Sequence, residues 1–431
     1  MRLPRLWRGL RARWKRLAAA GASAPAGWDT FTARPEAHAL ARTLVRLLTE
    51  NIVPFWYPGV IDSHDGGYRL NHDVAGRWKG PAAKRIVTQA RTVWFFARLA
   101  RSPYGTLEHL RAAEHGYHFL RDHMWDRRFG GFYWEVDSPG RVATNPRKDM
   151  MGQSFGLYAL AEYALASADA AAGRLARELF DLWETHAHDD QHGGYRREFR
   201  HDWSPLPDPY LKEMNTHMHL LEALTAYHRA TSDSRARQRV IELILVQSSA
   251  VVRKTRGVCT ERHQRDWTPL KAREDARVSY GHDLENIWLL AEAMDAAGLP
   301  SSLLVDLYRC IFDNAWRYGF DREHGGYFES GPFDAPADQC TKVWWVQAEA
   351  LVGALTLFHL TNEARHFESF CRTLDWIVAR QADWQHGDWH AEISRNGEPQ
   401  GDKAGTWKSP YHNGRAVLRC LALLGSGAAS A

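Results

Sequence analysis

Apolar residues recur along this chain at the three- and four-residue spacing of helices, and the predicted helices are of two alternating kinds. The first kind is apolar and aromatic nearly all round, which is typical of buried helices. These helices are expected at Lys84–Ala100, Asp149–Ala166, Leu211–Ala230, Tyr280–Ala297, Lys342–Leu360 and Ser409–Leu424. The second kind has a charged face and an apolar face, as in a solvent-facing layer, and is expected at Glu36–Asn51, Thr106–Met124, Gly173–Ala187, Ser234–Arg253, Ser301–Trp316 and Glu363–Arg380. The chain is therefore predicted to be all-α.

A turn built on glycine recurs between the predicted helix pairs. Asp65-Gly-Gly-Tyr68 and His192-Gly-Gly-Tyr195 are clear copies, and His386-Gly-Asp-Trp389 is a weaker one. The first glycines of the six copies, 62 to 68 residues apart, are Gly66, Gly130, Gly193, Gly257, Gly325 and Gly387. A period of this length predicts six helical-hairpin units. We expect an (α/α)6 barrel with short β-hairpin turns at one end; an open solenoid is the alternative, because repetition alone does not establish closure.

Composition and charge divide the chain into a leader and a body. Residues 1–27 hold seven basic residues and no acidic one, whereas the whole chain has a formal net charge of +4. The body is therefore net negative, which does not support a nucleic-acid-binding protein. Residues 28–431 are predicted to form a single catalytic barrel domain. The leader is predicted to be disordered; contact with an acidic membrane surface and a targeting role are the alternatives. A secretory signal is not supported, because the leader lacks an uninterrupted apolar core.

Two further features bear on where the protein acts. No apolar run of about 18 residues is present, so no membrane-spanning helix is expected. The 5 cysteines are scattered and show no C-x-x-C spacing, which is typical of reduced thiols in a cytoplasmic protein rather than of a disulfide framework or a zinc site. The 19 tryptophans suit either stacking on sugar rings or a large helical core.

Polar residues interrupt the buried helices at a recurring interval. From His219 the next positions follow at steps of 63, 63 and 67 residues, and Arg91 precedes His219 by 128. The resulting set is Arg91, Ser154 or a neighbour, His219, His282, Trp345 and His412. In a closed barrel of equivalent units these side chains would converge on one central pocket, which favours a functional site over a group of satisfied core histidines.

The residue types in this set favour proton transfer. Imidazoles with pKa values near neutrality can act as a paired base and acid, and Arg91 offers a fixed positive fork for an oxygen that gains negative charge. Glycoside hydrolysis fits poorly because it usually needs two opposed carboxylates, and only Glu285 is in register. Asn215 and His219 share a helix face, whereas His217 points away and is predicted either to pack in the core or to support a pocket residue from behind.

The same residues leave a metal site geometrically open. His219, His282 and His412 could meet around one ion, but neither an H-E-x-x-H motif nor a carboxylate-rich ligand pattern accompanies them. No phosphate-cradling loop is visible either. We therefore predict that the protein uses neither a metal nor another cofactor.

Five segments together resemble the N-acylglucosamine 2-epimerase superfamily, and within it most closely the cellobiose 2-epimerases. The resemblance extends over about residues 30 to 425 and keeps the order and spacing of the segments. They are Gln89-Ala-Arg91 with Trp94-Phe95, Asn215-Thr-His-Met-His219, Tyr280-Gly-His-Asp-Leu-Glu285, Lys342-Val-Trp-Trp-Val-Gln-Ala-Glu349 and Trp407-Lys-Ser-Pro-Tyr-His-Asn413.

The resemblance implies a role for each matched residue. His282 and His412 would be the catalytic proton-transfer pair, and His219 would assist ring opening or hold the reducing-end hydroxyls. The implied substrate contacts are Arg91 and Asn215 on the enediolate oxygens, Glu285 orienting His282, Trp345 and Trp407 stacking on sugar rings, and Tyr133 of Gly131-Phe-Tyr-Trp134 as a further aromatic contact.

The activity expected from the resemblance is cofactor-free epimerisation at C2 of the reducing-end aldose of a cellobiose- or lactose-type β-1,4 disaccharide. A mannose isomerase or mannose 2-epimerase is the close alternative, since these enzymes share much of the apparatus. A hydrolase on the same barrel and a non-catalytic sugar-binding protein are more distant alternatives. The partner is expected to be a small sugar, and the oligomeric state is left open.

Overall fold

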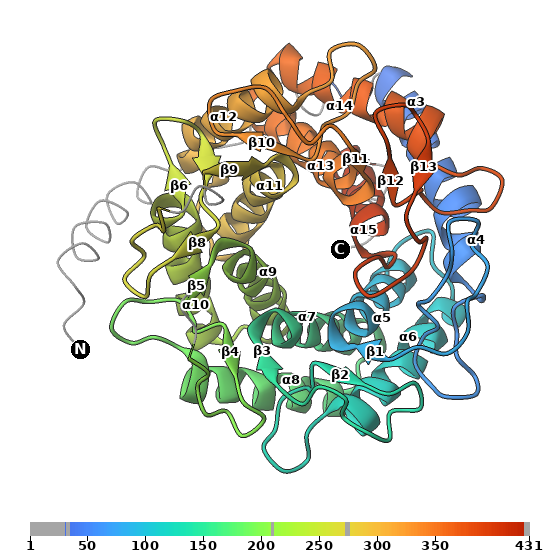
Figure 1. Cartoon of the computed structure of the whole chain (residues 1–431), viewed down its shortest axis with the longest axis vertical. Helices are drawn as coiled ribbons and strands as arrows, with labels where there is room; N and C mark the ends of the chain where they lie inside the picture. The colour runs from blue at the N-terminus through green and yellow to red at the C-terminus, as the bar shows by residue number, and fades with distance from the viewer. Residues whose placement is uncertain (1–30, 32–34, 208–210, 272–275, 426–431) are drawn as a thin grey trace.

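The helices of this protein form two concentric rings (Figure 1). The computed structural model describes residue 31 and residues 35–207, 211–271 and 276–425. The inner ring consists of α5 (Ile86–Ala100), α7 (Met150–Ser167), α9 (Met214–Thr231), α11 (Tyr280–Ala296), α13 (Trp344–Thr361) and α15 (Tyr411–Leu423). The outer ring consists of α3 (Pro35–Arg46) with the short α4 (Val53–Trp56), α6 (Leu107–Phe119), α8 (Ala170–Leu182), α10 (Ser234–Leu245), α12 (Val305–Asn314) and α14 (Ala364–Trp376). Both predicted series are confirmed.

The outer helices end in wider turns. A π-helical turn follows each of them, at η1 (Leu47–Ile52), η2 (Leu120–Met124), η3 (Trp183–Ala187), η4 (Val246–Ala250), η7 (Ala315–Gly319) and η8 (Ile377–Gln381), and the 3-10 turn η6 (Ser301–Leu304) precedes α12. These turns continue the helical hydrophobic period, which explains why the sequence predicts the second series a few residues longer.

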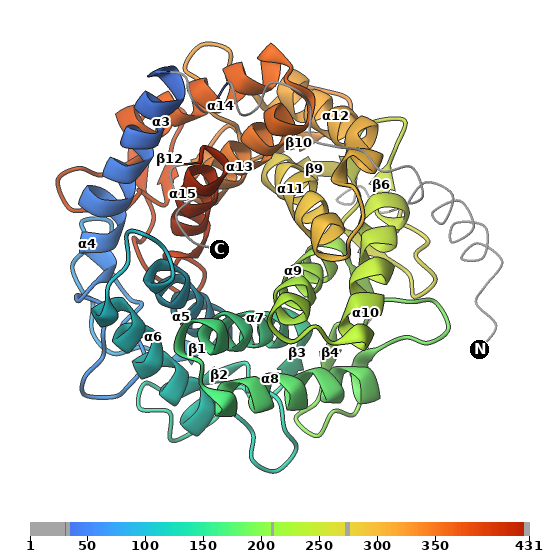
Figure 2. The ribbon, with the colours of Figure 1, turned by 180° about the vertical axis from the view of Figure 1, so that it is seen from behind.

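The ring is closed. The last inner helix, α15, packs against α13 on one side and against the first inner helix, α5, on the other. Both views of the molecule show the six inner helices encircling the centre (Figures 1 and 2). The (α/α)6 barrel is therefore confirmed, and the alternative of an open solenoid is wrong.

Short antiparallel strands lie at the end of the barrel where the inner helices begin. Five pairs join the strand before an inner helix to a strand of the next unit. They are β1 (Lys84–Arg85) with β2 (Glu135–Val136), β3 (Lys148–Asp149) with β4 (Glu198–Phe199), β5 (Lys212–Glu213) with β8 (Arg262–His263), β9 (Arg277–Ser279) with β10 (Ser330–Pro332), and β11 (Lys342–Val343) with β12 (Glu392–Ile393). The other pairs are β6 (Val252–Arg253) with β7 (Val258–Cys259), and β12 with β13 (Pro399–Gln400). Most of these strands thus tie neighbouring units together. Each glycine turn is in addition closed by an antiparallel bridge or, around Gly257, by β6 and β7, so the predicted short β-hairpin turns at one end of the barrel are confirmed. The bridges are Ile61–Tyr68, Trp125–Phe132, His188–Tyr195, Phe320–Tyr327 and Ala382–Trp389.

A buried lysine–aspartate pair recurs where a unit's glycine turn meets its inner helix. The pairs, with their Nζ–Oδ2 distances, are Lys84–Asp62 (2.9 Å), Lys148–Asp126 (2.8 Å), Lys212–Asp189 (3.1 Å) and Lys342–Asp321 (2.6 Å). The aspartates also accept hydrogen bonds from backbone N–H groups of the turn. Removal of one partner from such a buried pair typically costs about 3–5 kcal/mol, so each pair fixes its turn on its helix.

The fourth residue of an inner helix holds the same turn through an amide side chain. Gln89 accepts from the backbone N–H of Tyr68 and donates to its carbonyl, both at 2.9 Å. Gln153 and Gln347 repeat this contact in their own units. The turn must approach closely, because a Cβ on Gly67, where φ is +65°, would lie 2.6 Å from the Gln89 Oε1 atom.

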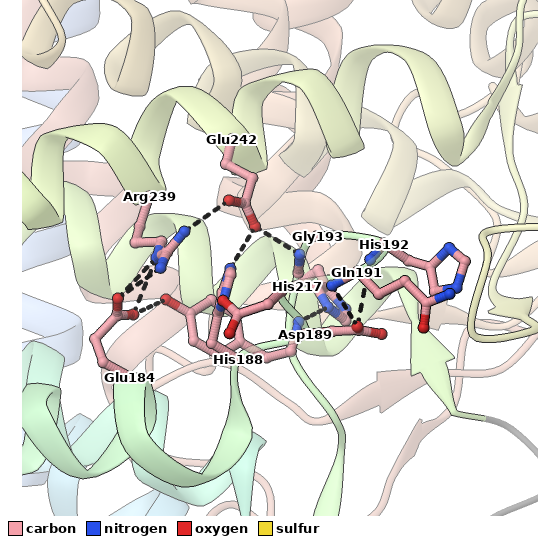
Figure 3. Close-up of polar contacts among 12 residues, drawn as sticks. Glu184, His188, Asp189, Gln191, His192, Gly193, His217, Arg239 and Glu242 are labelled. Carbon is pink, nitrogen blue, oxygen red and sulfur yellow. Dashed lines mark hydrogen bonds and ion pairs between the residues drawn. The ribbon is translucent and has the colours of Figure 1, made fainter. Parts of the chain in front are cut away.

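His217 takes the glutamine's place in the third unit. Its Nε2 accepts from the backbone N–H of Tyr195 at 2.9 Å, and its Nδ1 donates to the Glu213 carbonyl at 2.6 Å. Figure 3 shows the ring beside the turn that contains Asp189 and Gly193. Burial lowers the pKa of His217 to about 3, so the ring is neutral. The predicted packing role of His217 is confirmed.

Replacement of His217 by glutamine is expected to leave the fold intact, because glutamine makes the equivalent contact in three other units. His217→Ala leaves the buried N–H of Tyr195 without its acceptor, which typically costs about 1–3 kcal/mol, and adds a cavity. Urea denaturation of both variants measures the difference. A glutamine variant as unstable as the alanine variant would show that the units are not equivalent at this position.

Several other sequence predictions concern absent features. All five cysteines are free thiols. No helix in the described part of the chain combines the length and the apolar character that crossing a bilayer requires. The predicted leader, residues 1–27, lies outside the described residues, so the domain boundary remains a prediction.

Candidate active site

The inner helices surround a cavity of about 200 Å³ at the end where they begin, called the mouth cavity below. Eight of the nine predicted site residues line it. The lining consists of Arg91, Met151, Asn215, His219, His282, Glu285, Trp344, Trp345, Trp407 and His412. Residues from all six inner helices and one loop, far apart in the sequence, therefore meet at one place, as the closed ring predicts.

The equal sequence spacing of these residues does not reflect a shared helical register. Arg91 and His219 are the sixth residues of α5 and α9, whereas His282 is the third of α11 and His412 the second of α15. Three residues of helix rise about 4.5 Å, so the site has a rim layer and a deeper layer. Sequence spacing alone does not distinguish the two layers, because the start of each helix shifts when the connecting loops differ in length.

His412 is held by a carboxylate that the sequence analysis did not single out. Its Nδ1 lies 2.6 Å from the Oε1 atom of Glu349, the sixth residue of α13. Burial, with the nearby guanidinium groups of Arg91 and Arg415, lowers the pKa of His412 well below its usual value. The ring is therefore neutral, and a hydrogen bond from Nδ1 to Glu349 would leave Nε2 unprotonated and able to accept a proton. A glutamate inside an otherwise apolar helix was the available signal for Glu349.

His282 and His412 lie on the same tryptophan. The ring centroid of Trp345 is 4.7 Å from that of His282 and 5.8 Å from that of His412. Burial lowers the pKa of His282 to about 3, and His219 and Arg91 add to the shift. Both imidazoles are therefore neutral bases at the cavity rim.

Glu285 does not orient His282, contrary to the prediction. Its Oε1 atom accepts a hydrogen bond from Arg415 Nη2 at 2.6 Å. The carboxylate that approaches His282 is that of Glu261, with 3.9 Å between Nδ1 and Oε2. Glu285 is three residues after His282 and so shares its helix face, but it reaches inward, where a buried cation attracts it.

That cation, Arg415, joins three buried glutamates. Its Nη2 donates to Glu285 and to Glu349 at 2.6 and 2.7 Å, and its Nη1 donates to Glu222. Glu222 also accepts from His219 Nδ1 at 3.1 Å. All four charged groups are at most 5% exposed. Below, these residues are called the Arg415 cluster.

Mutual repulsion in the Arg415 cluster changes how its carboxyl groups titrate. Burial and the neighbouring Glu349 raise the pKa of Glu285 to about 7, and burial also raises that of Glu349. Against the effect of burial, Arg415 and His219 lower the pKa of Glu222. The cluster therefore exchanges a proton near neutral pH directly behind the imidazole of His412.

A divalent ion would have to compete with Arg415. Side-chain atoms of Glu285, Glu349 and His412 lie within 4.8 Å of one another, a spacing that suits metal ligands. Two of the three are carboxylates whose Oε1 atoms already accept from Arg415 Nη2. The guanidinium occupies the place that a cation would take, which supports the prediction of a metal-free site; that prediction remains to be tested.

Arg91 presents hydrogen-bond donors to the mouth cavity. Its guanidinium is held between aromatic rings, 4.0 Å from the Phe155 centroid and 4.6 Å from that of Tyr411, and Nη1 is 3.4 Å from the Trp407 carbonyl. It pairs with no carboxylate in the described ranges. A buried guanidinium held in this way is a ready site for a ligand oxygen that carries negative charge. Asn215 adds a buried Oδ1 without a hydrogen-bond partner among the described residues.

Aromatic residues border the entrance. Trp407 is 48% exposed, and its ring centroid lies 6.1 Å from that of Trp134. The structure does not bring Tyr133 to the mouth cavity; its ring packs over the Lys148 ammonium at 4.7 Å. Alternate residues of an extended segment point to opposite sides, so Trp134 rather than Tyr133 faces the entrance. We correct the prediction for Tyr133 accordingly.

Known proteins resemble this chain in sequence and in fold. The sequence profile of the N-acylglucosamine 2-epimerase (GlcNAc 2-epimerase) family matches residues 66–416. A cellobiose 2-epimerase of Bacteroides fragilis is 29% identical over 398 residues, which cover 90% of this chain and 99% of that protein. A D-mannose isomerase of Marinomonas mediterranea is 24% identical over 396 residues, which cover 89% and 98%. The solved structure of the cellobiose 2-epimerase from Spirochaeta thermophila has a TM-score of 0.82 and 32% identity, and the match covers 91% of this chain and 98% of that one. The chain belongs to the N-acylglucosamine 2-epimerase family of carbohydrate epimerases and isomerases.

Proposed function

We propose that this protein epimerises C2 of the reducing-end aldose of a β-1,4-linked disaccharide such as cellobiose or lactose. The observation that carries the proposal is the placement of His282 and His412, two neutral imidazoles on the ring of Trp345 at the cavity rim. Epimerisation needs a proton-transfer group on each face of the sugar at C2. A pair of bases from different helices, α11 and α15, can flank an open-chain sugar in this way.

The reaction that we propose moves one proton off C2 and another one on. One imidazole takes the C2 proton, the electrons of the C–H bond form the C1–C2 double bond, and the C1 carbonyl oxygen gains the negative charge. Arg91 and Asn215 bind the oxygens of this enediolate. The second imidazole takes up a proton from water while the negative enediolate is bound, and then donates it to C2 from the opposite face as the carbonyl at C1 forms again. The first imidazole releases the proton that it took from C2 to water.

Two further groups assist in this proposal. His219 Nδ1 is oriented by Glu222, so its other nitrogen can exchange a proton with the ring oxygen or a hydroxyl group during ring opening. Glu349 stabilises the imidazolium that forms when His412 takes a proton. The negative enediolate also favours protonated imidazole, although the pKa values of both histidines are low in the free protein.

The exposed ring of Trp407 supports a disaccharide as substrate. A monosaccharide whose C2 lies between the two imidazoles would leave the Trp407 ring in water. The second sugar ring of a disaccharide can cover it. The similarity to a D-mannose isomerase favours the second candidate, conversion of mannose to fructose at the same site. In that reaction the proton returns to C1, and a single shuttling base is sufficient.

The test is incubation of cellobiose, lactose and mannose in deuterated water, followed by proton NMR. We expect the 2-epimer of each disaccharide with deuterium at C2 of the product, and slower turnover of mannose. Rapid formation of fructose from mannose with inert disaccharides would replace the proposed substrate by the second candidate. Absence of exchange at C2 in every sugar would reject the proposed proton-transfer mechanism.

A further inference from the structure

A second cavity lies between the inner helices at the end of the barrel opposite to the mouth cavity. Figure 2 shows the ribbon of these helices from behind. It measures about 240 Å³ and is formed by the C-terminal halves of α5, α7, α9, α11 and α15. None of the predicted site residues lines it. It is called the rear cavity below.

A layer of buried side chains separates the rear cavity from the mouth cavity. The rings of Trp94 and Tyr158 stack at 5.0 Å, and Trp94 packs edge-on against Tyr411 at 5.6 Å. Glu222 and Arg415 complete the layer and line the rear cavity. On their other side they bond to residues of the mouth cavity, so the two cavities share one wall of charged groups.

The rear cavity has a surplus of positive charge. Beyond the Arg415 cluster, four arginines and two glutamates line it, namely Arg98, Arg101, Arg229, Arg419, Glu162 and Glu292. Against the effect of burial, Arg419 and Arg229 lower the pKa of Glu292 to about 2, so this carboxylate is ionised. Its negative charge balances one of the four arginines. Two arginine charges therefore remain without a compensating carboxylate in the cavity.

The surplus can be assigned to Arg98 and Arg419. Arg101 makes the close contact to Glu162 at 2.7 Å, whereas Arg98 is 3.6 Å away. Arg229 likewise bonds closely to Glu292, and Arg419 is 3.7 Å from that carboxylate. Both spare arginines are thus beyond hydrogen-bond distance of a partner carboxylate, and they come from the neighbouring helices α5 and α15.

Buried polar atoms without partners also face this region. The Nε atom of Arg419 and the hydroxyl of Thr225, a lining residue that is 3% exposed, have no hydrogen-bond partner among the described residues. Arg98 and Arg229 lie in the last turns of α5 and α9, where a positive charge stabilises the negative end of the helix dipole. This explanation does not apply to Arg419, because it lies before the last turn of α15.

We propose that the rear cavity binds a small dianion of the phosphate type, held by Arg98 and Arg419 with the Thr225 hydroxyl as a further donor. Guanidinium groups match the oxygens of phosphate with paired hydrogen bonds. The volume of 240 Å³ exceeds the ~30 Å³ that one water takes in the liquid by enough to hold a hydrated tetrahedral anion. The proposed anion site does not depend on which sugar binds in the mouth cavity.

Calorimetric titration of the whole protein with inorganic phosphate at constant ionic strength tests the proposal. We expect one saturable site that saturating cellobiose leaves unchanged. The double variant Arg98→Gln/Arg419→Gln should weaken binding at least ~10-fold, because it removes both guanidinium groups that donate charged hydrogen bonds to the anion. The matched control is Arg121→Gln on the outer layer, where the side chain is 39% exposed against 41% for Arg98, and it should bind phosphate normally.

A second variant protects the test against misfolding of the first. Leu165 lines the rear cavity and is 39% exposed, so Leu165→Glu adds a negative charge at the cavity without disturbing the core. It should weaken phosphate binding while circular dichroism and sugar turnover stay normal. The proposal is overturned if phosphate binding to the wild-type protein does not saturate or if cellobiose displaces the phosphate. It is also overturned if Arg98→Gln/Arg419→Gln and Leu165→Glu both bind phosphate as tightly as the wild-type protein.

Discussion

Alanine in place of His282 or of His412 is expected to lower kcat by ~10²–10⁴-fold while the barrel stays folded, because general acid–base groups contribute about that much. Each ring sits at the rim of the mouth cavity, where its removal breaks no glycine-turn contact. The measurement is steady-state turnover of cellobiose, with thermal unfolding of each variant as a check on the fold. His217→Gln serves as the matched control and should retain nearly full activity. Equal and mild losses in all three variants would show that neither rim imidazole transfers the proton.

The acid side of the pH profile provides a second readout for the same two groups. A base must be neutral to accept a proton, and burial lowers the pKa of both rim histidines below the ordinary value of about 6.5. In the wild-type protein kcat/KM should therefore stay level as the pH falls through 6.5 and decline only at lower pH. A decline centred between 6.5 and 7 would assign the titrating group to another residue, either an exposed histidine or Glu285, whose pKa is about 7.

Methionine in place of Arg415 is expected to cost about 3–5 kcal/mol of the free energy of unfolding, because it leaves the carboxylates of Glu222, Glu285 and Glu349 buried without their common partner. Urea denaturation measures this loss. Arg415→Lys is the matched control; it keeps the charge but cannot donate the same set of hydrogen bonds, so an intermediate loss is expected.

The loss in Arg415→Met should depend on pH in a direction that the carboxylates determine. Burial already raises the pKa values of Glu285 and Glu349 above the unfolded value of about 4.3, and loss of the guanidinium raises the values of all three carboxyl groups further. The folded state then binds more protons than the unfolded state, so stability falls as the pH rises through the raised pKa values. The variant should be more stable at pH 5 than at pH 8. Equal stability at both values would show that water or another residue compensates the buried charges.

Much of the fold could be predicted because it follows from local patterns of apolar residues and glycines in the sequence. The helical period identifies each inner and outer helix, and the glycine turns identify the repeat of about 64 residues. The length of the π-helical turns was not predictable, since they continue the same apolar period. Nor was the pairing of strands between units, because strands of two residues carry too little pattern to indicate a partner.

The site could be predicted in composition but not in layering. The motifs around His282 and His412 identify the two imidazoles, and the closed ring then brings them to Trp345. The partners of His282 and Glu285 were assigned wrongly, because helical spacing states which residues share a face and not how far each side chain reaches. The choice between Tyr133 and Trp134 likewise depends on the direction of a short extended segment.

The sequence by itself determined the number of units, the alternation of buried and amphipathic helices, and the side chains that meet at the mouth of the barrel, because these follow from periods of 3.6 and about 64 residues. Only the tertiary structure decided that Arg415 holds three glutamates from α9, α11 and α13, and that Glu349 supports His412. It also decided that Arg98 and Arg419 face a second cavity. The physical reason is that a buried charge is stable only beside its partners, and those partners come from helices that become neighbours only when the ring closes.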